Sequence, residues 1–96
     1  MAKQKFVVHC KRAHYDVLVD RTTIWGNPFT WKFKDGIDPK FIVKNRDEAI
    51  GKFRTWILTQ PDLVAQLPKL RGKILGCWCA PSRCHGDVLA ELANYI

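Results

Sequence analysis

Three cysteines and one histidine lie within nine positions near the carboxyl end of the sequence, in the stretch CWCAPSRCH. They are Cys77, Cys79, Cys84 and His85. A thiolate is a nucleophile and a metal ligand, and an imidazole carries protons near neutral pH or binds metals. The cluster therefore predicts one of two kinds of site, a reactive centre or a metal centre.

The reactive alternative follows from the elements on either side of the cluster. Residues 73–77 have the composition of a strand, and a helix is expected to begin within residues 82–85. Cys84 would then stand in or beside the first helical turn, near Arg83, where unpaired amides and the helix dipole stabilise a thiolate. We therefore predict an activated cysteine in a loop near the surface. Asp87, in the same first turn, is either a proton carrier or, equally, a simple partner of the helix dipole. The candidate catalytic residues are Cys84, His85 and Asp87.

The metal alternative uses the same four side chains as a Cys3His set suited to Zn²⁺. Their spacing departs from that of structural zinc sites, because the C-x-C and C-H pairs lack the gap of roughly two to four residues that brings paired ligands onto one ion. No cofactor is certain, and zinc is the one that the sequence allows. A third explanation is that Cys77 and Cys10 are simply buried core residues. The candidate zinc ligands are Cys77, Cys79, Cys84 and His85.

A second unusual stretch, WGNPF, occupies residues 25–29 and follows Arg21. Gly26 predicts a positive φ or the close approach of a ligand. The aromatic side chains of this corner, with Trp31, predict either a stacking wall for a base or part of the core. Asn27 suits a hydrogen bond to a base edge or a turn cap, and Arg21 suits a phosphate. The candidate ligand-binding residues are Arg21, Trp25, Gly26, Asn27, Phe29 and Arg83.

The charge balance favours a phosphate-bearing partner. Lys and Arg number 16 against 9 for Asp and Glu, which gives a formal net charge of +7. The stretch 63–86, which contains the cysteine cluster, carries four basic residues and no acid. A positive field of this kind attracts nucleotides and nucleic acid, although a basic surface also serves solubility.

The apolar content is typical of a compact globular protein. Hydrophobic residues make up 47% of the sequence, and residues 1–96 are expected to form a single domain. No apolar run approaches the roughly 20 residues that span a bilayer, and the basic start does not continue into a signal-peptide pattern. We therefore expect no membrane partner and a cytoplasmic location, where thiols stay reduced.

The predicted order of elements is β-β-loop-α-α-β-α. Asn45 followed by Glu48 predicts the capped start of a helix, and Asp35-Gly36 predicts a turn in the preceding loop. Helices covering a short sheet give an α/β or α+β class, a small sheet with about three helices, and leave the strand order open. Strands are expected at residues 5–10, 15–21 and 73–77, and helices at 45–60, 61–67 and from 82–85 onward.

The two motifs together resemble domain-of-unknown-function family 4326, a small domain of bacteria, archaea and phages. The resemblance is carried by R-x-x-x-W-G-N-P-F at residues 21–29 and by LRGKILGCWCAPSRCHGDVL at residues 70–89, and it covers nearly the whole chain. It implies that the family signature falls on the WGNPF corner and on the cysteine–histidine loop. It implies no established activity.

Three functions stay open on the sequence alone. The first is a small enzyme or binding domain for a nucleotide or nucleobase, with the helix end holding a phosphate. The second is a nucleic-acid-binding module without catalysis. The third is a zinc-stabilised protein-interaction module, for example a phage protein that binds a host factor. The polar features favour a nucleotide- or nucleic-acid-directed domain, with an enzyme preferred, and no motif names a reaction.

Overall fold

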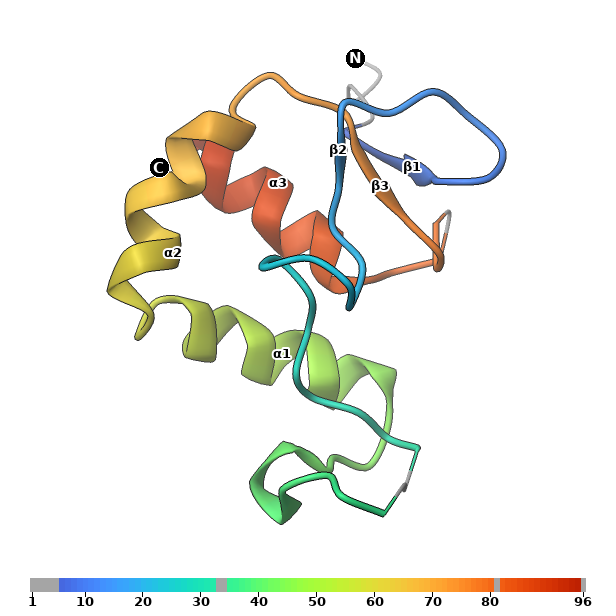
Figure 1. The fold of residues 1–96 in the computed structure, drawn as a ribbon, viewed down its shortest axis with the longest axis vertical. Helices are drawn as coiled ribbons and strands as arrows, with labels where there is room; N and C mark the ends of the chain where they lie inside the picture. The colour runs from blue at the N-terminus through green and yellow to red at the C-terminus, as the bar shows by residue number, and fades with distance from the viewer. Residues whose placement is uncertain (1–5, 33–34, 81, 96) are drawn as a thin grey trace.

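A computed structural model describes residues 6–32, 35–80 and 82–95, and it shows a small α/β fold in the predicted order (Figure 1). The first predicted strand began at Lys5, which lies outside the described residues. Two short 3₁₀ helices, η1 and η2, add to the predicted elements. In chain order the elements are β1 Val7–His9, β2 Val17–Leu18, η1 Pro39–Phe41, α1 Arg46–Ile57, α2 Pro61–Gln66, η2 Leu67–Leu70, β3 Leu75–Cys77 and α3 His85–Tyr95.

The sheet has three parallel strands in the order β1-β3-β2. Leu75 of the central strand is in register with Val7 on one side and with Val17 on the other. All of β3 is buried, as expected for a strand with neighbours on both edges. Because the strands are parallel, their carboxyl ends meet at one edge of the sheet, and the chain after each strand starts there.

The strand β2 is much shorter than the predicted 15–21. Only Val17 and Leu18 form the strand, and the N–H of Val19 adds one more bond to the carbonyl of Gly76 at 3.0 Å. The next residue, Asp20, turns the chain, because its carboxylate accepts the backbone N–H of Thr22 at 2.9 Å. This local hydrogen bond competes with strand pairing and ends the strand.

Helix α1 begins as predicted. The side chain of Asn45 accepts the N–H of Glu48 at 2.9 Å, which satisfies one of the free amides of the first turn. Its buried face carries Ala49, Phe53 and Ile57 in the core. The helix ends at Ile57 rather than near residue 60, and α2 then begins at a proline, as the sequence indicated.

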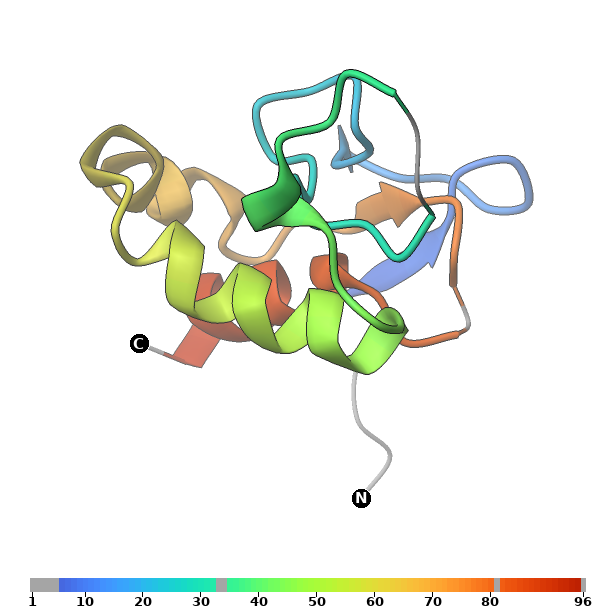
Figure 2. The ribbon, with the colours of Figure 1, turned by 90° about the horizontal axis from the view of Figure 1, so that it is seen from below.

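Helix α3 lies between the sheet and α1, as Figures 1 and 2 show. It contacts β1 and β3 on one side and α1 and η2 on the others, so most of its surface is buried. Val88, Leu89, Leu92 and Ala93 are among its buried residues. Its first turn consequently has a fixed position beside the carboxyl edge of the sheet. Within the described part of the chain, no helix has the length and apolarity needed to cross a membrane.

Candidate functional site

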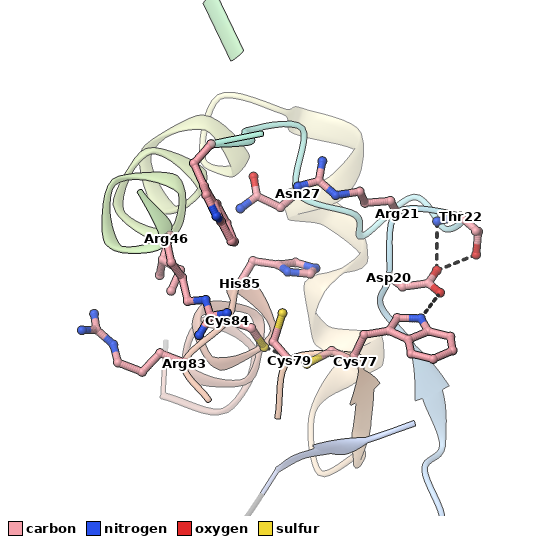
Figure 3. A pocket seen from close by; sticks show the side chains of 13 residues that line it. Asp20, Arg21, Thr22, Asn27, Arg46, Cys77, Cys79, Arg83, Cys84 and His85 are labelled. Atoms are coloured by element: carbon pink, nitrogen blue, oxygen red, sulfur yellow. Dashed lines mark hydrogen bonds between the residues drawn. The ribbon is translucent and has the colours of Figure 1, made fainter. Parts of the chain in front are cut away.

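A pocket of about 310 Å³ opens at the carboxyl edge of the sheet (Figure 3). In open α/β sheets this edge is where ligands bind. The walls come from the chain after β2, the loop after β3, the start of α3 and one side of α1. Among the residues predicted from sequence, those that line the pocket are Arg21, Asn27, Trp31, Cys77, Cys79, Arg83, Cys84 and His85.

Asp20, which the sequence analysis missed, follows β2 and is the acidic residue of this pocket lining. One carboxylate oxygen accepts the hydroxyl and the backbone N–H of Thr22, and the other accepts the indole N–H of Trp78 at 3.0 Å. These hydrogen bonds hold the pKa of Asp20 below its usual value, and the Thr22 hydroxyl makes the largest contribution. The side chain is therefore anionic. An Asp-x-Thr sequence at the end of a predicted strand was the available signal.

Trp78 forms an exposed aromatic wall beside the pocket and was also missed. Its side chain is 53% exposed, yet its position is fixed on several sides. Besides the hydrogen bond to Asp20, the ring of His9 meets it edge-on at 5.8 Å, and Nζ of Lys11 lies 5.4 Å from its centroid. A half-exposed indole held by these contacts is suited to stacking on a planar ligand.

Trp31 and three arginines also line the pocket, with Arg46 and Arg83 across it from Arg21 (Figure 3). The guanidinium of Arg46 lies 5.5 Å from the ring centroid of Trp31. Arg83 is paired with Asp47 at 2.9 Å, but both side chains are more than two-thirds exposed, so this pair is weak and Arg83 can turn to a ligand. With Arg21, these residues give the pocket three cations against one carboxylate.

The structure corrects the prediction that Trp25 and Phe29 face a ligand. Both are core residues, 6% and 7% exposed, and neither lines the pocket. Trp25 and Phe29 therefore fit the second predicted alternative, that these aromatics belong to the core, whereas Trp31 lines the pocket. In a chain of this length, large aromatics are needed inside to build the core.

Gly26 and Asn27 shape the pocket through the backbone. Gly26 has no positive φ; instead, an added Cβ would lie 2.6 Å from Cα of Arg21, so the glycine permits a close approach within the chain. Buried Asn27 donates to the carbonyl of Ala49 at 3.1 Å and accepts the N–H of Phe29 at 2.8 Å. The WGNPF corner thus braces the pocket loop against α1.

The start of α3 is capped by the chain itself. The N–H of Cys84, the residue before the helix, donates to the carboxylate of Asp87 at 3.1 Å. Asp87 is exposed and lies outside the pocket lining. Asp87 therefore caps the helix and pairs with its dipole, which is the second of the two predicted explanations. It does not stand in the pocket, where a proton carrier would have to lie.

His85 lies at the centre of the pocket view, between the Asn27 loop and the cysteine sulfurs (Figure 3). Its Nε2 is 2.6 Å from the carbonyl oxygen of Val19, which can only accept, so Nε2 carries the proton in the neutral ring. Burial, with a smaller contribution from the positive charge of Arg21, lowers the pKa of His85 below its ordinary value. His85 is consequently a neutral imidazole at physiological pH.

Cys77 and Cys84 face each other, with their sulfurs 2.8 Å apart. Both are buried, at 1% and 3% exposure, which corrects the prediction that Cys84 lies near the surface. The thiol of Cys84 lowers the pKa of Cys77 to about 6, and the same contact together with burial raises the pKa of Cys84 above its ordinary value. The two thiols therefore titrate as a coupled pair, in which the contact between the sulfurs lets one thiol ionise more readily than an isolated cysteine.

Cys77 and Cys84 lie closer together than two ligands of one zinc ion would. Two sulfurs bound to one tetrahedral zinc at about 2.3 Å each lie roughly 3.8 Å apart, farther than the 2.8 Å observed between Cys77 and Cys84. Among residues 6–32, 35–80 and 82–95, no group of three or more His, Cys, Asp and Glu side chains is placed to hold a metal. Zinc stays a prediction, which metal analysis of the purified protein tests.

Two comparisons place the chain among known sequences. The family described as "Domain of unknown function (DUF4326)" matches residues 4–95. A protein of enterobacteria phage T4, described as an uncharacterized 12.4 kDa protein in the nrdA-td intergenic region, is 35% identical over 91 residues. The alignment covers 94% of this chain and 78% of the phage protein. No solved structure matches.

Proposed function

Because the chain belongs to the DUF4326 family, whose description assigns no activity, we propose a function from the pocket: it binds a nucleotide, free or within a nucleic-acid strand. The observation that carries this proposal is the meeting of two tryptophans and three arginines on one small pocket at the carboxyl edge of a parallel sheet. Aromatic faces suit a base, and guanidinium groups suit a phosphate.

The size and charge of the pocket support a single nucleotide unit. Its volume of about 310 Å³ is at the lower end of the range for small-molecule sites. Trp78 and Trp31 offer stacking surface, and Arg21, Arg46 and Arg83 supply the positive charge. Base and phosphate are therefore both matched within one cavity.

An enzyme is preferred over a passive binding module, because the pocket also holds groups that binding alone does not need. His85 offers an unprotonated ring nitrogen, and Cys77 and Cys84 place a thiolate and a thiol at the same wall. Neutral imidazole and thiolate are the forms in which these side chains act as base and nucleophile. The reaction itself is left open.

Calorimetric titration with a panel of nucleoside monophosphates tests the proposal. We expect saturable binding that is weakened about 5- to 160-fold by Trp78→Leu, since stacking on an aromatic contributes about 1–3 kcal/mol per base. Arg83→Gln is expected to weaken binding about 3- to 10-fold, the loss of one partly screened charge contact. The matched control is Lys69→Gln, which removes an exposed charge from η2, outside the pocket lining.

The outcomes separate the candidate functions. Equal weakening by Arg83→Gln and Lys69→Gln, or no binding of either millimolar mononucleotides or single-stranded oligonucleotides, would reject the pocket proposal. Tight binding of single-stranded oligonucleotides with a steep salt dependence, and none of mononucleotides, would favour a nucleic-acid-binding module. One equivalent of zinc retained after dialysis, with no nucleotide binding, would favour the zinc-stabilised interaction module.

A further inference from the structure

Cys77 and Cys84 are held together by two rigid elements. Cys77 is the last residue of the central strand, and the N–H of Cys10 bonds to its carbonyl at 3.0 Å. Cys84 directly precedes α3, the helix that packs against both β1 and β3. The contact between the two sulfurs is therefore fixed by the core of the protein and does not depend on a mobile surface loop.

The packing around Cys84 directs its sulfur toward Cys77. A Cβ added at Gly86 would lie 3.3 Å from the sulfur of Cys84 and 3.2 Å from a methyl of Val7, so the glycine leaves the space that this side chain fills. The sulfurs are 2.8 Å apart, and a disulfide bond of about 2.05 Å needs an approach of only about 0.8 Å. A covalent bond between them requires side-chain adjustment and no rearrangement of the fold.

The pair is also within reach of a small oxidant. Both residues line the pocket although their side chains are almost fully buried, so the cavity provides access from solvent. Cys79 lines the same pocket and Cys10 follows β1, but the only sulfur–sulfur contact within the described residues joins Cys77 to Cys84. The first oxidation product of one thiol therefore has a second thiol beside it.

We propose that Cys77 and Cys84 form a reversible disulfide at the wall of the pocket when the protein meets hydrogen peroxide. One thiolate sulfur attacks a peroxide oxygen, the O–O bond breaks, and hydroxide leaves, so that a sulfenic acid forms. The second sulfur attacks the sulfenic sulfur, the S–O bond breaks, and the oxygen leaves as water. In sum, two thiols and one hydrogen peroxide give one disulfide and two waters. A dithiol reductant reverses the bond by thiol–disulfide exchange.

This inference goes beyond the nucleotide pocket and holds whether or not a nucleotide binds. In a reducing compartment, disulfides between such close thiols are transient and report oxidation. A bond from the end of β3 to the start of α3 would join the two elements that present Trp78 and His85 to the cavity. The oxidised and reduced proteins are thus two chemical forms of the same site.

The sequence allows a direct mapping experiment. The reduced full-length protein is treated with hydrogen peroxide, alkylated under denaturing conditions and digested with trypsin without reduction. Cleavage after Lys73 and Arg83 places Cys77 and Cys79 in the peptide 74–83 and Cys84 in the peptide 84–96. We expect the two peptides to be cross-linked, and the intact monomer to lose two hydrogens, with both changes reversed by dithiothreitol.

Two variants identify the partner of Cys84. Cys79→Ser is expected to keep the cross-link and Cys77→Ser to lose it; the first variant keeps the test valid if the second, a core substitution, fails to fold. The proposal is overturned if Cys79→Ser abolishes the cross-link, if the cross-link occurs only in covalent dimers, or if Cys84 goes to sulfinic acid without a cross-link. Zinc bound to the reduced protein that shields both sulfurs from peroxide would overturn it as well.

Discussion

Replacing Gly26 by alanine should destabilise the protein by forcing apart two stretches of backbone. The new Cβ would lie 2.6 Å from Cα of Arg21 and 2.9 Å from the carbonyl oxygen of Asp20, closer than the 3.0 Å limit that real Cβ atoms respect. Both neighbours are main-chain atoms, so no side chain can rotate away. The chain must shift at the two residues that lead from β2 into the pocket.

The magnitude follows from the cost of inserting a methyl group where there is no space for it. Overpacking of this kind costs about 1–3 kcal/mol, and we expect about 2 kcal/mol for Gly26→Ala. For a domain of this size, 1 kcal/mol lowers Tm by roughly 4–8 °C, so the melting temperature should fall by about 8–16 °C. Urea unfolding followed by tryptophan fluorescence measures the free energy, and circular dichroism measures Tm.

Gly51→Ala is the matched control, because it adds the same methyl group to an open position. Gly51 lies inside α1, is exposed, and has no atom within 4 Å of an added Cβ. Alanine there should stabilise the protein by about 0.5–1 kcal/mol through its higher helix propensity. The two substitutions must therefore have opposite signs. A free energy of unfolding for Gly26→Ala within about 0.5 kcal/mol of the wild type would refute the close approach.

Three further predictions concern the pocket and its supports. Asn27→Ala should lower the free energy of unfolding by about 2 kcal/mol in a urea titration, because the buried N–H of Phe29 loses its acceptor; a change below about 0.5 kcal/mol would contradict this. Stability should fall as the pH drops below 6.5, by up to about 1.36 kcal/mol per pH unit until the lowered pKa of folded His85 is reached, because the unfolded chain takes up a proton that the folded chain excludes. This slope should be absent in His85→Gln, and its persistence there would assign it to another group. The Cys77–Cys84 disulfide should raise the free energy of unfolding by about 2.5 kcal/mol through loop closure, measured as the difference between oxidised and reduced protein, and equal stabilities would contradict that.

Elements with a local sequence signal were predictable. The cap of α1 depends on Asn45 and on an amide three residues later, both within one turn, and the structure confirms it. The order of elements and the helix start beside Cys84 were also encoded in local composition and periodicity. The strand order was not, because β1 and β2 pair with opposite edges of β3, and no local pattern selects an edge.

The site was predicted only in part, since its chemistry depends on distances across the chain. The motif placed Cys84 at a helix start, but its burial and the position of its proton are set by the sulfur of Cys77 and by the packing of α3. Trp78 was missed because its hydrogen-bond partner, Asp20, is 58 residues away. The sequence left Trp25 either as a ligand-binding residue or as a core residue, because an aromatic side chain suits both places. Only its packing in the structure distinguishes the two.

Two-dimensional NMR of the four tryptophan indole N–H groups during a titration with a nucleoside monophosphate tests the central claim most directly. Trp31 and Trp78 line the pocket, whereas Trp25 and Trp56 do not and serve as controls in the same spectrum. The account predicts saturable shifts of the Trp31 and Trp78 signals, with those of Trp25 and Trp56 nearly unchanged. Shifts confined to the other two tryptophans, or no shift with either millimolar nucleotide or a single-stranded oligonucleotide, would contradict it.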